Sequence, residues 1–107
     1  MRMWNVNPEL MCRNHLLGEH VECHMFVGTL NKNKNVEGYL KKGLLEIHNI
    51  QKRHEQLVKE MKKRGFSHNS PLPKYKKIIK GKIDVKENKK ELFKRCRRCG
   101  KNEFFKF

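Results

Sequence analysis

The chain has few acidic residues and no long hydrophobic run, and each shortage limits the class of protein to which it can belong. Its 107 residues include 11 Asp and Glu against 26 Lys and Arg, which gives a formal net charge of +15. No apolar stretch approaches the roughly 20 residues that a membrane-spanning helix needs, and the N-terminus lacks the apolar core of a secretory signal. We therefore expect a soluble intracellular, cytoplasmic protein whose four cysteines are thiols or metal ligands rather than disulfides.

The basic charge is concentrated in the last third of the chain. Residues 74–107 contain 14 Lys and Arg against four Asp and Glu. Such an excess attracts polyanions, because lysine and arginine neutralise phosphates and release counterions. Nucleic acid is the first candidate partner and an anionic membrane surface the second. The length allows one domain with one core, so we expect a core over 1–73 and a basic C-terminal extension over 74–107 that completes it.

The first 26 residues predict a helix with an unusual division of side chains. Asn7 can cap this helix, and Pro8 suits its first turn. At about 100° per residue, one face carries His, Glu and Cys, and the opposite face is apolar. The first face comprises Cys12, His15, Glu19, Glu22 and Cys23, and the second comprises Leu10, Leu17 and Val21. The simplest interpretation is a surface helix whose acidic face is solvated.

Helical patterns continue along the chain and predict an all-α fold, a compact single-domain helical bundle. After the short apolar stretch 26–30 and a polar loop over 31–35, a short helical piece is expected over 36–42. A strongly amphipathic helix is expected to begin at Leu44 and to end at Gly65.

The remainder combines a turn-rich connection with a basic helix. The connection covers 67–73, and the helix is expected over about 85–97, with Leu92 and Phe93 packed inward. The aromatic residues within 104–107 have two equal interpretations: stacking on exposed bases or anchoring the chain end on the core.

Cys96 and Cys99 form a Cys-x-x-Cys pair, which is half of a zinc ribbon or knuckle pattern. Structural zinc needs four ligands, and no second close pair of cysteines exists, since the other two are eleven residues apart. Three interpretations stay open: zinc completed by His68 or His24, reduced surface thiols, and a redox dithiol.

The histidines give no clear metal motif. His20 and His24 are four residues apart and can share an ion, whereas His15 points away from both. No third ligand is evident from the sequence. His54 lies on the apolar stripe of the long helix, where a hydrogen-bonded core or edge histidine is a better interpretation than a ligand. We therefore predict no metal site and no cofactor.

Two blocks of the sequence resemble the pyrimidine-dimer DNA glycosylases of the phage endonuclease V type. The first is the opening segment with HLLGEH and the glutamate that follows, and the second is QKRHEQLVKEMKKRGF over 51–66. Together they cover somewhat under half of the chain, and the C-terminal third does not match. The resemblance implies a compact, monomeric all-α protein that kinks damaged double-stranded DNA and flips out a base, without metal or cofactor.

The resemblance also implies catalysis by an N-terminal amine. In this family the amine attacks the sugar C1′, displaces the base and leaves a Schiff base, and β-elimination then cuts the strand, an AP-lyase reaction. Counting back from His15 places Met1 in that position, and Arg2 is too large for ordinary removal of the initiator methionine. A useful fraction of an α-amine is neutral at cellular pH, and amines commonly form Schiff bases. Glu22 matches the family's catalytic carboxylate.

Three further residues match the family's site. Arg2 and His15 match positions that bind DNA or order the site, and Asn14 replaces a similar amide. Glu19 shares their helix face and is expected either to orient Arg2 or His15 or to be solvated.

The sequence departs from the family pattern around Glu22. Two family arginines that grip the damaged DNA appear here as Val21 and Met25, and His20 and His24 stand beside them as weaker DNA contacts at neutral pH. The target is thus open among dimers, other lesions, modified bases and abasic sites. The alternative function is a non-catalytic, basic nucleic-acid-binding protein on the same fold.

Overall fold

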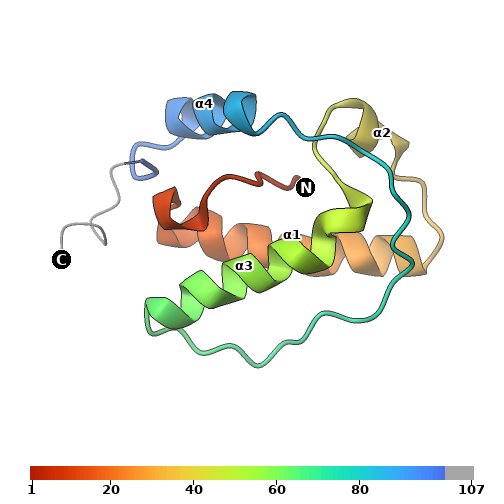
Figure 1. Ribbon diagram of the computed structural model, residues 1–107, viewed down its shortest axis with the longest axis horizontal. Coiled ribbons are helices and arrows are strands. Elements are labelled where there is room, and N and C mark those ends of the chain that lie inside the picture. Colours follow the sequence, from red (N-terminus) through yellow and green to blue (C-terminus); the bar gives the residue numbers. More distant parts are fainter. Residues whose placement is uncertain (101–107) are drawn as a thin grey trace.

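In a computed structural model, which describes residues 1–100, all regular structure is helical (Figure 1). The predicted all-α class is therefore confirmed. In chain order the elements are η1 (Pro8–Leu10), α1 (Arg13–Asn31), α2 (Glu37–Lys41), η2 (Ile47–Asn49), α3 (Ile50–Lys63) and α4 (Val85–Arg95). None of these helices is long and apolar enough to span a membrane. The expectations for the aromatic residues within 104–107 lie outside the described residues.

Helices α1 and α3 pack against each other and form the frame of the molecule (Figure 1). Each contributes apolar side chains that are removed from water, which is the main favourable term in folding. The fully buried ones are Leu16, Cys23, Phe26 and Val27 from α1, and Ile50 and Leu57 from α3. The amphipathic pattern of 50–61 thus predicts the buried face of α3 correctly.

The N-terminal segment runs extended between this frame and α4 (Figure 1). Met3 and Val6 are fully buried, and the Met3 N–H donates to the Leu44 carbonyl at 2.7 Å. From α4, the Asn88 side-chain amide donates to the carbonyl oxygens of Met3 at 3.3 Å and Trp4 at 2.9 Å. Hydrogen bonds to its backbone therefore hold the N-terminal segment in the interior of the fold.

The first helix differs from its prediction at both ends. Asn7 does act as a cap, since its Oδ1 accepts from the Glu9 N–H at 3.1 Å, but it caps only the short η1. Met11 is extended and fully buried, so its inward packing breaks the helix, which restarts at Arg13. At the other end α1 continues through Gly28 to Asn31, so the stretch 26–30, expected to follow the helix, belongs to it.

The predicted faces of this first helix are also wrong. Val21 is 53% exposed, whereas Glu19 on the supposedly solvated face is 1% exposed. The polar face packs inward because Arg53 of α3 neutralises the Glu19 carboxylate at 2.5 Å. Because the Glu19 charge is paired with Arg53, this part of the helix face can be buried.

The short and long helices of the middle region are largely as expected. Helix α2 is confirmed, and Gly43 follows it with a φ of +68°. Gly65 ends α3 with a φ of +85°, and the Phe66 N–H returns to the Met61 carbonyl at 2.9 Å. The start at Leu44 is wrong, because α3 begins at Ile50 after the short η2.

A long segment without helix, residues 66–84, joins α3 to α4 and carries the chain around the frame (Figure 1). It pairs with the segment before α3, since the Ile47 N–H donates to the Lys80 carbonyl and the Ile83 N–H to the Glu46 carboxylate. These bonds explain why the α-helix begins only at Ile50, after the short η2. Helix α4 ends at Arg95 rather than near 97, because Cys96 is extended.

Candidate active site

Met1 and Glu22 line one cleft of about 290 Å³. The N-terminal segment, the first half of α1 and the end of α4 form its walls. Its lining residues are Met1, Arg2, Trp4, Asn14, His15, Gly18, Glu19, Glu22 and Arg95. The structure thus brings together five residues that the sequence marks as site candidates: Met1, Arg2, Asn14, His15 and Glu22.

The Glu22 carboxylate faces the start of the chain. Burial raises the pKa of the Glu22 carboxyl above its ordinary value, while the positive N-terminal amine and a hydrogen bond from the Arg2 backbone N–H oppose this rise. Met1 and Glu22 thus share one cleft, and the positive amine favours the ionised form of the Glu22 carboxyl. A carboxylate beside an amine can accept a proton from it and stabilise a neighbouring positive charge.

Arg2 is fixed by two contacts. Its guanidinium lies 3.8 Å from the centre of the Trp4 ring, and its Nη2 donates to the Asn88 Oδ1 at 2.7 Å. Burial and the nearby positive charge of Arg95 lower the pKa of Arg2. Two guanidinium groups in one cleft favour a phosphate or another anionic group as the ligand.

Glu19 has a structural partner in place of the expected ones. Arg53 donates to Glu19 through Nε at 2.5 Å and through Nη2 at 2.8 Å, and the Asn5 N–H donates to it at 3.4 Å. The solvated alternative is therefore wrong. This bidentate pair joins α1 to α3, and its Glu19 lines the cleft.

His15 borders two different environments. It lines the cleft, with its ring edge-on to Trp4 at a centroid distance of 6.0 Å, and burial lowers its pKa. Its Nδ1 lies 3.2 Å from Cys12 Sγ and 3.6 Å from Cys99 Sγ. Asn14 is exposed at the cleft's edge, where it can reach an incoming ligand.

His20 and His24 do not line this cleft. His20 is 8% exposed, and its Nε2 lies 2.9 Å from that of His68, while His24 Nε2 lies 3.1 Å from that of His54. Their contact with DNA stays a prediction, and the burial of His20 counts against it. The two positions of the missing arginines, Val21 and Met25, are 53% and 49% exposed on α1.

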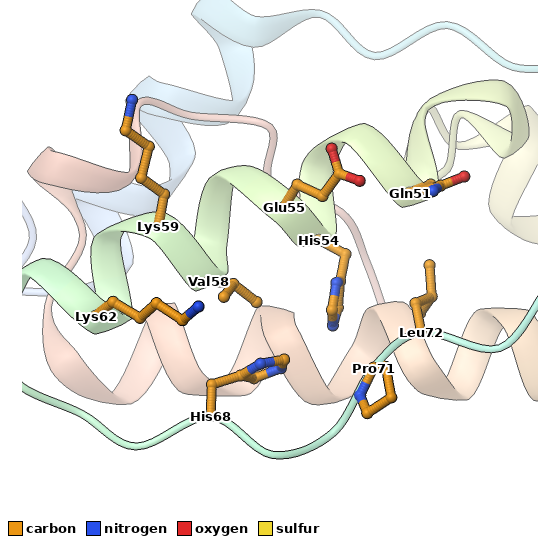
Figure 2. A pocket seen from close by; sticks show the side chains of 9 residues that line it. All are labelled: Gln51, His54, Glu55, Val58, Lys59, Lys62, His68, Pro71 and Leu72. Carbon is orange, nitrogen blue, oxygen red and sulfur yellow. The ribbon is translucent and has the colours of Figure 1, made fainter.

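A second hollow of about 520 Å³ lies along α3, away from the cleft, and shares no lining residue with it (Figure 2). Figure 2 shows His54 from α3 and His68 from the connecting segment at its wall. Their ring centroids are 5.3 Å apart. The interpretation of His54 as a hydrogen-bonded histidine is correct, since its Nε2 contacts that of His24. The interpretation misses that the rings of His20 and His68 also lie beside His54.

Sequence reasoning missed two residues of α4. Arg95 lines the cleft and Asn88 holds Arg2, yet neither belongs to a motif. Only the return of the chain over the N-terminal segment brings them there. The sequence also gave the wrong neighbours for Cys96 and Cys99, because Cys12 and His15 stand beside them in place of His24 or His68.

The fold and the cleft define a small all-α protein in which Met1 and Glu22 line the same cleft. A family model described as "Pyrimidine dimer DNA glycosylase" matches residues 1–74. The chain belongs to this family, which makes it a DNA-repair glycosylase acting on DNA at the family level. Searches among curated proteins and solved structures found no match. The matched region contains Met1, Glu22 and Arg53 and ends before α4.

Proposed function

We propose that this protein is a DNA glycosylase with linked AP-lyase activity, in which the α-amine of Met1 is the nucleophile. The observation that carries the proposal is that Met1 and Glu22 line one cleft together with Arg2 and Arg95. An amine can attack a sugar carbon only in its neutral form, and in this proposal Glu22 accepts the proton.

The proposed reaction needs no group beyond the protein, DNA and water. The neutral amine bonds to the sugar C1′, and the bond from C1′ to the base breaks, with the base leaving with the electron pair and gaining a proton. The sugar ring then opens to give a Schiff base between Met1 and C1′. Removal of a proton from C2′ breaks the C3′–O bond by β-elimination, and hydrolysis of the Schiff base releases the protein.

The DNA-facing parts of the cleft have separate roles in this proposal. Arg2 and Arg95 bind backbone phosphates, and Asn14 and His15 contact the DNA at the edge of the cleft. Glu22 stabilises the positive charge that develops on the sugar and on the Schiff base, because a carboxylate in a half-buried cleft interacts more strongly with it than in water. The substrate is double-stranded DNA with a damaged or modified base, or an abasic site.

The test is borohydride trapping on duplex DNA that carries one abasic site or one thymine dimer. Borohydride reduces a Schiff base to a stable amine, so a covalent protein–DNA adduct is expected. Because the chain has 26 Lys and Arg, peptide mapping must place the adduct at Met1 rather than at a lysine. Intact mass must also show that Met1 is the free N-terminus of the protein used.

Three variants complete the test. An additional residue before Met1 and Glu22→Gln are each expected to abolish strand cutting, whereas Glu9→Gln, an exposed carboxylate outside the cleft, is expected to cut normally. Normal cutting by the first two variants would overturn the mechanism. DNA binding without any adduct on either substrate would favour the non-catalytic DNA-binding alternative.

A further inference from the structure

Three sulfur atoms and one imidazole nitrogen converge between the start of α1 and the end of α4. They belong to Cys12, His15, Cys96 and Cys99, whose ligand atoms all lie within 4.8 Å of one another. The four cysteines of the chain are free, so these thiols are not consumed by a disulfide. In sequence the group reads as two close pairs, Cys-x-x-His and Cys-x-x-Cys.

The distances agree with a zinc tetrahedron. From a Zn–S bond of about 2.3 Å and a Zn–N bond of about 2.0 Å, tetrahedral sulfurs lie about 3.8 Å apart, and a sulfur and a nitrogen about 3.6 Å apart. Here Cys12 Sγ lies 3.7 Å from Cys96 Sγ, and His15 Nδ1 lies 3.2 Å from Cys12 Sγ and 3.6 Å from Cys99 Sγ. Three thiolates and one imidazole are a common ligand set of structural zinc.

A backbone N–H group stabilises one of the sulfurs. The Cys12 N–H donates to Cys99 Sγ at 3.2 Å. Such second-shell donors stabilise negative sulfur and orient it toward a metal.

The turn after Cys99 is built to hold this arrangement. Gly100 has a φ of +80°, and its N–H donates to the Leu10 carbonyl at 2.8 Å. A Cβ at this position would lie 3.0 Å from the Phe93 ring. The chain can therefore close back on the segment before α1 only with glycine here.

We propose that Cys12, His15, Cys96 and Cys99 bind one structural Zn²⁺ that fastens the end of α4 to the start of α1. The ion would set the separation of His15 and Arg95, which both line the cleft. It would also close the long loop between residues 12 and 99, which favours the folded state. The site does not depend on the proposed reaction.

The first test measures the metal content of the full-length, untagged protein by inductively coupled plasma mass spectrometry. The wild-type protein is expected to contain zinc, and Cys99→Ala is expected to lose one equivalent. Cys23→Ala is the matched control, because Cys23 is a cysteine of α1 outside the cluster. A zinc content that is unchanged by Cys99→Ala would overturn the proposal.

A second measurement needs no variant and guards against misfolding of Cys99→Ala. Co²⁺ replaces zinc and absorbs in the near ultraviolet when thiolates bind it, with an intensity that follows the number of sulfur ligands. The wild-type protein is expected to show the bands of tetrahedral Co²⁺ with three thiolates. A protein that takes up Co²⁺ without thiolate bands, or takes up none, would contradict the site.

The histidine cluster carries an independent inference. His20, His24, His54 and His68 offer four nitrogens within 4.8 Å of one another, from α1, α3 and the connecting segment. The pairs at 2.9 Å and 3.1 Å are close to the spacing of about 3.3 Å in a tetrahedron of zinc and imidazoles.

We infer that this cluster binds a second divalent transition-metal ion of the kind that prefers imidazole, such as Zn²⁺. Through His68 the ion would attach the connecting segment to α1 and α3. His68 is at the wall of the open hollow (Figure 2), which provides the entry path.

The test is again a count of bound metal, now with Zn²⁺ added to chelator-treated full-length protein. Two equivalents are expected in the wild type, and His68→Gln is expected to bind one while leaving the cobalt–thiolate bands unchanged. His48→Gln is the control, since His48 lies outside the cluster. The inference fails if His68→Gln binds as much Zn²⁺ as the wild type.

Discussion

Glu19 and Arg53 form a buried, bidentate ion pair that joins α1 to α3, and Glu19 also lines the candidate active site. Their side chains are 0% and 2% exposed, and the two bonds measure 2.5 Å and 2.8 Å. Arg53 also donates to the Met11 sulfur at 3.3 Å. Met11 lies between η1 and α1. The ion pair is therefore linked through Arg53 to the turn that precedes α1.

We expect Glu19→Ala to lower the free energy of unfolding by about 3–5 kcal/mol, because it leaves the Arg53 guanidinium buried without its carboxylate. Lys63→Ala is the control, since the Lys63–Glu9 pair has side chains that are 65% and 45% exposed. Exposed pairs contribute at most about 1 kcal/mol. Urea unfolding of both variants measures the difference, and equal losses would contradict this account of the pair.

Asn88 is a positioning residue whose effect should be visible in the reaction rate. Its amide holds the backbone of Met3 and Trp4, and its oxygen accepts from Arg2. We expect Asn88→Ala to let the N-terminal segment shift and to slow adduct formation at saturating DNA by roughly 10- to 100-fold.

A loss of stability alone would not produce that slowing. Asn35→Ala is the matched control, because the exposed Asn35 Oδ1 only accepts from the Glu37 N–H at the start of α2. Losing such a cap costs about 1 kcal/mol, and adduct formation should be unaffected. If both variants slow equally at a temperature where both are folded, Asn88 has no positioning role.

The sequence predicts the parts of this structure that depend on local pattern. The helix over 50–63 follows from its apolar spacing, and its end follows from Gly65. The register of Met1 against Glu22 follows from the HLLGEH block, and both residues do line one cleft. Each of these signals lies within one short stretch of chain.

The remaining features depend on partners that are distant in sequence. The sequence predicts for Glu19 either solvation or a contact with Arg2 or His15, because its actual partner Arg53 is 34 residues away and carries no mark of burial. Cys12 and His15 are read as parts of a helix face because the Cys96 pair stands 84 residues later. A Cys-x-x-His spacing was visible at 12–15, and counting histidines with cysteines would have supplied the second pair.

Tyr75 should give the unfolding free energy a dependence on alkaline pH. Its hydroxyl donates to the Ile47 carbonyl at 2.9 Å and accepts from the Gln51 N–H at 3.1 Å. Burial raises the pKa of Tyr75, so the folded protein holds this proton more tightly than the unfolded chain. Its contribution is fully present below the ordinary tyrosine pKa of about 10 and is lost as pH rises through the raised pKa.

We therefore expect Tyr75→Phe to be less stable than the wild type near pH 8, by about 0.5–1.5 kcal/mol for the lost hydrogen bonds. The gap should narrow above about pH 10, because only the wild type must then lose a buried proton. Urea unfolding across this range measures the gap. Tyr39→Phe, whose parent ring packs edge-on against Phe26, is the control, and a gap that widens with pH would contradict the argument.

Arg95 should contribute to DNA binding through charge rather than through base recognition. It lines the cleft from α4, beyond the region that matches the family, and its guanidinium lies 6.0 Å from the Trp4 ring. If it binds one phosphate, Arg95→Gln should reduce the slope of log K against log salt concentration by about 0.9. The loss of affinity should be similar for duplexes of different sequence, because phosphates carry no sequence information.

Lys34→Gln removes the same charge from the exposed turn after α1 and should leave the slope nearly unchanged. Fluorescence anisotropy with labelled duplexes at several salt concentrations separates the two variants. Equal slopes for both would show that the charge of Arg95 acts only as part of the general positive field, and the cleft would then lack this phosphate contact.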